Sequence, residues 1–288
     1  MDLNTSRDFS TISPSAKALL LLKGYTPIPF AKQAALLISK PEVYAPDFTR
    51  KDAAFWVYAV HFENRYWSID QLLQGLPVTN ILEISSGFSF RGLAAVQQNP
   101  VHYVDTDLPE VMEIKKQLVA ELGADTTNLK MLPLNALDEE QFNRAINVLP
   151  EGDVAIVNEG LLVYLNEAEK KQLCSIIRNV LEKRGGYWIT ADIYIKRDTN
   201  LDSVQMDSEL KSFFEQHRIE DNKFDSFEAA REFFKNEGFI VDKEAEPDRE
   251  KLSTLPYLIG SLTSGQLAKL STSVKTQAAW RLKLAIQP

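Results

Sequence analysis

The chain has 288 residues, of which 44% are hydrophobic and 25% charged, so it is long enough and apolar enough to bury one large core. Its 32 Lys and Arg against 40 Asp and Glu give a formal net charge of −8 (32 − 40). An acidic balance disfavours binding to phosphate backbones and to anionic membranes. We therefore expect neither nucleic acid nor a membrane as a partner.

The short apolar stretch near the N-terminus and the few Cys and His residues bear on cellular location, disulfide bonds and metal binding. The apolar stretch 18–22 is bounded by Lys17 and Lys23, which makes it too short for a signal sequence or a membrane span, so we expect a cytoplasmic protein. The single cysteine, Cys174, excludes an internal disulfide framework and is expected to be a small buried hydrophobe. Three scattered histidines offer no metal-ligand spacing, so we expect no structural metal.

Residues 1–75 show helical signals and no strand-like alternation. Ser13 suits a helix cap, Pro14 suits the first helical position, and Gly24 suits the stop. Two further helices are predicted over residues 29–39 and 47–66. The segment is therefore predicted to be an N-terminal helical lid.

Residues 76–288 are predicted to form the second unit, an α/β domain. Short apolar runs alternate with helical windows, which predicts a parallel sheet with helices on both faces. The predicted strands are 78–84, 101–104, 129–132, 154–157 and 187–192, and the helices between them are 90–98, 109–122, 138–148 and 166–182. A helical insert is expected at about 195–225, followed by a helix over 226–237. Strands 239–241 and 278–284, paired antiparallel at the sheet edge, would bring the total to seven strands.

A turn of small residues follows the first predicted strand. It runs through Glu83, Ser85 and Gly87, and such a turn lets a ligand approach the backbone before a helix begins. It lacks two glycines of the G-x-G-x-x-G pattern, so taken alone it favours a simple strand-to-helix connection.

The second strand adds a matching acid. It ends in residues 104–109, VDTDLP, which contain Asp105 and Asp107. Asp107 stands twenty residues after Gly87, where an acid reaches ribose hydroxyls in Rossmann-like folds. The alternative is that Asp107 only caps the helix that starts near Pro109. Together with the small-residue turn, a nucleoside-binding role is favoured.

S-adenosylmethionine and a nicotinamide dinucleotide both fit this combination of turn and acid. A dinucleotide also needs its pyrophosphate cradled, usually by three glycines that this turn lacks. The chain also contains no Tyr-x-x-x-Lys, the usual proton-donor motif of short-chain dehydrogenases. S-adenosylmethionine is therefore the favoured cofactor.

Three motifs together resemble the leucine carboxyl methyltransferase family, which includes bacterial O-methyltransferases of small-molecule biosynthesis. They are the turn after the first strand, residues 104–109, and residues 158–165, NEGLLVYL, in the family's order and spacing. Upstream, Lys17, residues 24–30 and Arg65 are similar to the family's lysine, its Gly-Tyr-x-x-x-Pro-aromatic element and its cofactor-binding arginine. The resemblance implies a Rossmann-like class I methyltransferase fold.

The same resemblance implies a set of residues that bind S-adenosylmethionine. Lys17 and Arg65 would clamp the methionine carboxylate, with Gly87 leaving room for it, and Glu159 would lie beside the ammonium group. Asp107 would hold the ribose. Asn135, where the family has an aspartate, would accept the adenine amino group. The full expected set also contains Glu83, Ser85 and Asp105.

Alternatives remain for these ligands. A lysine such as Lys17 on a helix usually belongs to a solvated face, and an arginine such as Arg65 is often in a surface ion pair. In the turn, Ser85 and Ser89 replace the family's glycine and aspartate.

The methyl acceptor is expected to be a small organic molecule held among aromatic side chains. The expected walls of the acceptor pocket are Tyr25, Phe30, Tyr164 and Tyr194. The same aromatics are also compatible with a core of the lid. A carboxylate acceptor is ionised at neutral pH and needs no base, whereas a phenol or enol needs one, and no histidine lies near the motifs. The catalytic residues therefore stay open.

The function predicted from the sequence is an S-adenosylmethionine-dependent O-methyltransferase. Its acceptor is predicted to be the carboxylate or hydroxyl of a small molecule, and the oligomeric state stays open. The alternatives are methylation of a protein C-terminal carboxylate, a nicotinamide oxidoreductase, a cofactor-binding protein without turnover, and a structural interaction module.

Overall fold

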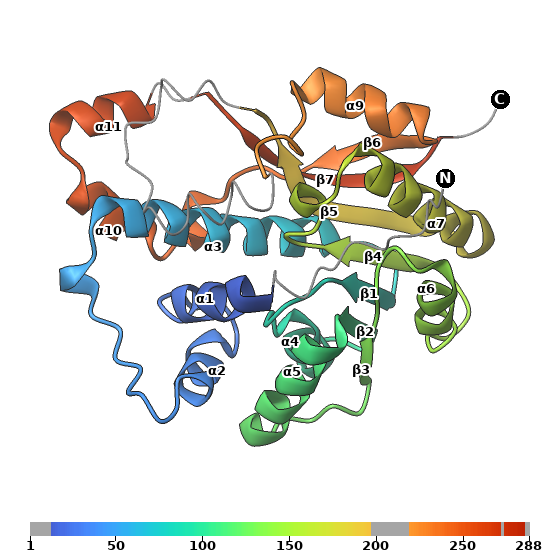
Figure 1. Cartoon of the computed structure of the whole chain (residues 1–288), viewed down its shortest axis with the longest axis horizontal. Helices are drawn as coiled ribbons and strands as arrows, with labels where there is room; N and C mark the ends of the chain where they lie inside the picture. The colour runs from blue at the N-terminus through green and yellow to red at the C-terminus, as the bar shows by residue number, and fades with distance from the viewer. Residues whose placement is uncertain (1–12, 197–218, 272–273, 286–288) are drawn as a thin grey trace, which may run out of the picture.

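The computed structural model describes residues 13–196, 219–271 and 274–285, which form a seven-stranded sheet covered by helices (Figure 1). The sheet order is β3-β2-β1-β4-β5-β7-β6. Neighbours pair in parallel from β3 to β5, and β7 runs antiparallel to both β5 and β6. The strands are β1 Asn80–Ile84, β2 His102–Asp107, β3 Leu129–Pro133, β4 Val154–Asn158, β5 Gly186–Tyr194, β6 Phe239–Glu244 and β7 Gln277–Leu284. This confirms the predicted fold class, a Rossmann-like, mostly parallel sheet with an antiparallel edge hairpin.

The register of the parallel strands brings their carboxyl ends to one edge of the sheet. Ile84 of β1 aligns with Asn158 of β4, and Asn158 aligns with Thr190 of β5. The turns that follow β1, β2 and β4 therefore meet at this edge, where open parallel sheets bind their ligands.

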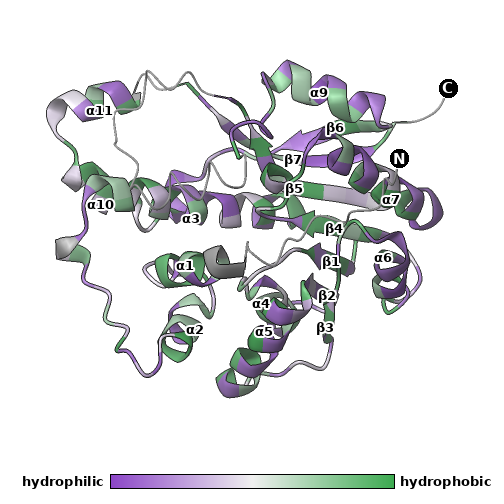
Figure 2. Ribbon diagram, viewed as in Figure 1, coloured by the Kyte–Doolittle hydropathy of each residue, from purple (hydrophilic) through white to green (hydrophobic). Residues whose placement is uncertain are grey.

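The crossover helices begin and end where local sequence signals place them. They are α4 Arg91–Gln98, α5 Pro109–Leu122, α6 Glu139–Ile146, α7 Glu167–Arg184 and α9 Phe227–Asn236. Asn166 and Glu169 form a capping box at the start of α7, and α5 has a proline at its first position and ends at Gly123 in the left-handed conformation. Figure 2 shows hydrophilic and hydrophobic residues mixed along α5, α7 and α9, as expected for helices that cover a sheet on one side.

Two hydrophobic clusters fill the two faces of the sheet. Alternate residues of one strand supply them: Ile156 of β4 packs in the cluster under α6, α7 and α9, whereas Val157 packs in the cluster under α4 and α5. Cys174 is fully buried in the first cluster, as expected from its apolar surroundings in sequence.

The chain before β1 is helical, as predicted, and contributes α1 Ser13–Lys23, α2 Ala31–Ile38, the short 3-10 helix η2 Phe48–Arg50 and α3 Ala53–Leu73. The third predicted helix, 47–66, differs at both ends. Asp47 caps only η2, and Asp52 caps α3 by accepting a hydrogen bond from the amide of Phe55. α3 then continues to Leu73 and packs against β5 and β7. A boundary between a lid and a main domain near residue 75 stays a prediction.

Two helices between β6 and β7 have no counterpart in the sequence-based prediction. They are α10 Leu255–Ser261 and α11 Ser264–Ser271. Glu63 of α3 anchors α10, because its carboxylate accepts hydrogen bonds from the backbone amides and the hydroxyls of Ser253 and Thr254. Figure 1 shows α10 beside one end of α3. Most of the predicted helical insert at 195–225 lies outside the described residues.

Within the described ranges, no helix combines the length and the apolar composition needed to cross a membrane. The same residues contain no group of three or more His, Cys, Asp or Glu side chains arranged to hold a metal ion.

Candidate cofactor-binding site

The turn between β1 and α4 brings Gly87 and Asp107 into direct contact. The Gly87 amide donates a hydrogen bond to Oδ2 of Asp107 at 2.6 Å, and the Leu108 amide donates to Oδ1 at 2.7 Å. Gly87 has φ 54°, and a Cβ built there would meet only Ala16 Cβ, at 3.7 Å. Gly87 therefore lies between a fixed carboxylate and the side chain of Ala16 on α1, which is at van der Waals distance. Burial raises the pKa of Asp107 above its usual range.

The side chain of Asp105 supports this turn through a hydrogen bond from the hydroxyl of Ser86. Its carboxylate pairs with Nζ of Lys115 at 2.6 Å and accepts a hydrogen bond from Oγ of Ser86 at 2.5 Å, and Lys115 also donates to Ser86 at 2.9 Å. The Asp105 and Lys115 side chains are each about 1% exposed. The structure thus places Asp105, an expected cofactor ligand, inside the support of the turn.

Glu83 is likewise fully buried, inside the sheet. It accepts a hydrogen bond from the Tyr103 hydroxyl at 2.7 Å, and its Oε1 lies 3.4 Å from Nε of Arg91. Burial raises the pKa of Glu83 to about 7. Its position supports α4 through Arg91.

Glu159, directly after β4, is surrounded by three cations. Lys23 Nζ lies 2.8 Å from Oε1, Arg91 Nη2 lies 2.9 Å from Oε2, and Arg65 Nη2 lies 3.8 Å from Oε1. The Glu159 side chain is only 5% exposed. Burial alone would raise its pKa, but the three cations outweigh burial and lower the pKa of Glu159 to about 2. Glu159 is therefore a carboxylate at neutral pH.

Asp192 of β5 fixes the chain on both sides of Glu159. Its carboxylate accepts hydrogen bonds from the Gly160 and Leu161 amides, each at 2.7 Å, and from the side-chain amide of Asn158, also at 2.7 Å. A Cβ on Gly160, which has φ 88°, would lie 2.9 Å from Nη2 of Arg65. Glycine at this position therefore lets Arg65 approach the loop.

Tyr194, at the carboxyl end of β5, joins this group through its hydroxyl. Arg65 Nη1 donates a hydrogen bond to the Tyr194 oxygen at 3.1 Å, and His61 Nε2 lies 2.7 Å from the same oxygen. Arg65 Nη2 also lies 3.5 Å from Oδ1 of Asp192. Tyr194, one of the expected acceptor walls, is thus connected to Glu159 through Arg65.

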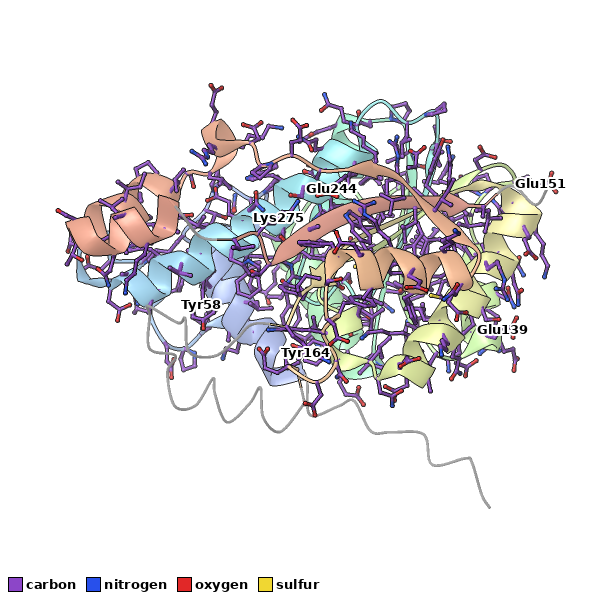
Figure 3. The ribbon with its side chains drawn as sticks, turned by 90° about the horizontal axis from the view of Figure 1, so that it is seen from above. Tyr58, Glu139, Glu151, Tyr164, Glu244 and Lys275 are labelled. Carbon is purple, nitrogen blue, oxygen red and sulfur yellow. The ribbon has the colours of Figure 1, made fainter. Side chains whose placement is uncertain are left out.

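The other expected acceptor walls occupy different environments. Tyr25 packs edge-on against Phe55, with ring centroids 4.8 Å apart, in an aromatic group between α3 and α10. Phe30 precedes α2 in a left-handed conformation and packs against the core beneath α4 and α5. Tyr164 is half-buried on the turn after β4, and Figure 3 shows it along the same edge of the molecule as Tyr58 of α3. These three residues stay predictions as acceptor contacts.

Two of the expected cofactor ligands, Lys17 and Asn135, make no contact with the charged group around Glu159 that the structure shows. Lys17 is exposed on α1, and Lys23, at the end of the same helix, is the lysine that contacts Glu159. Asn135 is half-buried, and its side-chain oxygen accepts a hydrogen bond from the Leu137 amide at 3.0 Å. One lone pair of that oxygen remains for an adenine amino group. Ser85, with φ 52°, shapes the turn through its backbone.

The structure adds three residues that the sequence-based analysis did not select: Lys23, Arg91 and His61. Lys23 carries a signal in hindsight, because it directly precedes the family-like element 24–30. Arg91 follows the small-residue turn at the first position of α4. His61 stands one helical turn before Arg65 on α3, so both face the same way.

The donor set fits the amino-acid end of S-adenosylmethionine, which carries a carboxylate and an ammonium. Nε of Arg65 is buried and has no hydrogen-bond partner within the described structure. Arg65 and Lys23 can receive the carboxylate, and Glu159 can receive the ammonium. Asp107 retains lone pairs for ribose hydroxyls beside the two amides that it accepts.

In a comparison with family models, the leucine carboxyl methyltransferase model matches residues 65–178. These residues contain Arg65, the β1 turn, Asp107 and Glu159. The match confirms, over this range, the resemblance to S-adenosylmethionine-dependent methyltransferases. Comparison with curated proteins finds no sequence match.

Similar solved structures include LepI in complex with SAM, at 11% identity and TM-score 0.44, covering 90% of this chain and 53% of LepI. The mitomycin 7-O-methyltransferase MmcR is similar at 10% identity and TM-score 0.47, covering 95% and 72%. The geranyl diphosphate C-methyltransferase of Streptomyces coelicolor is similar at 14% identity and TM-score 0.48, covering 81% and 84%. The chain thus spans about half the length of LepI.

Proposed function

We propose that this chain, whose residues 65–178 match the leucine carboxyl methyltransferase family, is an S-adenosylmethionine-dependent O-methyltransferase that acts on a small organic acceptor. The observation that carries the proposal is the set of charges around Glu159. One buried carboxylate with Lys23, Arg65 and Arg91 beside it can bind a zwitterionic amino acid, and Asp107 lies at the neighbouring strand end.

When bound, S-adenosylmethionine supplies an electrophilic methyl group. The chain's residues hold and orient it: Arg65 and Lys23 at the carboxylate, Glu159 at the ammonium, Asp107 at the ribose and Asn135 at the adenine. Such alignment is the main requirement of an in-line displacement. Holding the reacting groups in the right geometry can lower the activation barrier by roughly 7–11 kcal/mol.

The site is less suited to a nicotinamide dinucleotide. The β1 turn offers one glycine, Gly87, with its amide already bonded to Asp107, and the amide of Ser86 donates to the Thr106 carbonyl. Neither amide is available to cradle a pyrophosphate. These contacts support the methyltransferase proposal over the oxidoreductase alternative.

A small acceptor is favoured over a protein C-terminus. Tyr194, whose hydroxyl is bonded to Arg65 beside Glu159, offers an aromatic wall that suits a compact organic molecule. The net charge of −8 also disfavours long-range attraction of an acidic peptide tail.

The test is methyl transfer from labelled S-adenosylmethionine to a panel of small carboxylic acids and phenols, beside a peptide with a free C-terminal leucine carboxylate. Methylation of any small acid or phenol supports the proposal. Methylation of the peptide alone contradicts the small-molecule acceptor. Native mass spectrometry of the purified protein for retained S-adenosylmethionine or S-adenosylhomocysteine tests cofactor binding separately from turnover.

A further inference from the structure

Glu159 and its three cations, Lys23, Arg65 and Arg91, form a group that we call the Glu159 cluster. A histidine and a tyrosine from distant parts of the chain meet beside it. His61 Nε2 lies 2.7 Å from the Tyr194 oxygen, across 133 positions of sequence. Their rings are 5.7 Å apart between centroids. Tyr194 is also bonded to Arg65, which reaches Glu159, so the pair lies one side chain away from the proposed place of the cofactor's amino-acid end.

One hydrogen bond at the Tyr194 oxygen has a direction fixed by chemistry, and the direction of the other follows the tautomer of His61. A guanidinium has no acceptor, so Arg65 donates to the Tyr194 oxygen. Burial raises the pKa of Tyr194 above its usual range, so the hydroxyl keeps its proton at neutral pH. That proton is then free to point at His61, whose Nε2 accepts it when the neutral imidazole carries its own hydrogen on Nδ1.

We infer that His61, acting through Tyr194, takes up the proton of the substrate hydroxyl that is methylated. The substrate of this site is therefore a phenol or an enol. The inference rests on the proposed function and deepens it. A carboxylic acid is already ionised at neutral pH and needs no such pair, whereas a phenol, with a pKa of about 10, keeps its proton.

The proton transfer balances with the methyl transfer. The acceptor hydroxyl gives its proton to the Tyr194 oxygen while the Tyr194 proton moves to His61 Nε2. The acceptor oxygen uses a lone pair for its new bond to the methyl carbon, and the electron pair of the broken carbon–sulfur bond stays on sulfur. The positive charge of the sulfonium is thereby replaced by the positive charge of the imidazolium.

The tautomer of His61 tests the inference without any turnover. Nitrogen NMR of the full-length protein at neutral pH is expected to show an unprotonated His61 Nε2 that accepts a hydrogen bond, with the proton on Nδ1. Tyr194→Phe is expected to shift the Nε2 resonance of His61 and to leave that of His102, which is exposed at the start of β2, in place. A proton resident on Nε2 overturns the inference.

Activity with graded acceptors tests the same inference in the reaction. The probes are 1-naphthol, 4-nitrophenol, which is more acidic, and benzoic acid. His61→Ala is expected to lower the rate with naphthol at least a hundredfold, with much less loss for 4-nitrophenol, and with partial rescue by added imidazole. His102→Ala is the matched control and is expected to react as the wild type does.

The outcomes separate the inference from the proposed function. Methylation of benzoic acid alone, unaffected by His61→Ala, overturns the hydroxyl acceptor and leaves the methyltransferase standing. Failure of the wild type to bind S-adenosylhomocysteine in calorimetry contradicts the proposed function itself, and with it the inference. Unchanged binding of S-adenosylhomocysteine by His61→Ala, together with the loss of naphthol methylation, supports both.

Discussion

Lys23 Nζ lies 2.8 Å from Oε1 of Glu159, although 136 positions of sequence separate the two residues. Arg91 holds the other carboxylate oxygen at 2.9 Å. The end of α1 therefore belongs to the same charged group as the start of α4 and the end of β4. The first helix is part of the candidate site and not only a cover over it.

Lys23 is predicted to contribute to cofactor binding more than Lys17 does. Lys23→Met should weaken the binding of S-adenosylhomocysteine by roughly 1.5–3 kcal/mol, because a charge-assisted hydrogen bond is lost at a buried site. Lys17→Met, on the exposed side of the same helix, is the matched control and should change affinity little. Calorimetry on both variants measures the difference. A larger loss in Lys17→Met would instead support the lysine chosen from the family resemblance.

The Glu159 cluster predicts a pH dependence of stability. The pKa of Glu159 in the folded protein, about 2, is lower than the ordinary value of 4.5, so Glu159 stabilises the fold fully above about pH 5 and loses that contribution as the pH falls toward 2. The difference in free energy of unfolding between wild type and Glu159→Gln should therefore shrink by about 1 kcal/mol from pH 6 to pH 3.5. Urea unfolding across this range measures it. A difference that stays constant with pH would mean that Glu159 titrates normally.

The buried Lys115–Asp105 pair is predicted to be essential for the turn that carries Gly87. Lys115→Met leaves Asp105 as a buried, unpaired charge, removes the hydrogen bond to Ser86, and should cost about 3–5 kcal/mol of stability. Adding Asp105→Asn should restore part of this loss, since no uncompensated charge remains. Lys116→Met, on the exposed side of α5, is the control in the same urea experiment. Equal effects of Lys115→Met and Lys116→Met would show that the pair is energetically unimportant.

Gly160 is predicted to act on binding as well as on stability. Gly160→Ala and Gly123→Ala both place a side chain at positive φ, and each should cost about 1–2 kcal/mol of stability. Only at Gly160 does the new Cβ approach Arg65, whereas no atom lies within 4 Å at Gly123. Affinity for S-adenosylhomocysteine should fall in the first variant alone. A fall of similar size in both variants would point to a general loss of structure.

The sequence predicts most of the fold because its signals are local. The helix Pro109–Leu122 is predicted with its observed bounds, since Pro109 and Gly123 mark its two ends. The sequence-based prediction contains neither α10 nor α11. α10 is held by Glu63, a residue 190 positions earlier in the chain than Ser253, and such a contact leaves no local pattern.

The candidate site is less accessible to sequence than the fold. Asp107 and Glu159 stand at strand ends, so topology alone brings them to one edge. His61 meets Tyr194 only because α3 packs across β5, and spacing along the chain does not reveal this. Asp105 and Glu83 belong to the motifs from which cofactor ligands were predicted. Their side chains instead contact buried residues of the protein: Asp105 contacts Lys115, and Glu83 contacts Tyr103.

Calorimetry of the wild-type protein with S-adenosylhomocysteine and with NAD tests the central claim most directly. Asp107→Ala and, as a control, the exposed Asp125→Ala are measured beside it. The wild type and Asp125→Ala are predicted to bind S-adenosylhomocysteine and not NAD. Asp107→Ala is predicted to bind it about 1–3 kcal/mol more weakly, because the ribose hydroxyls lose a charged acceptor. Tighter binding of NAD by the wild type, or equal binding of S-adenosylhomocysteine by Asp107→Ala and the wild type, would contradict the account.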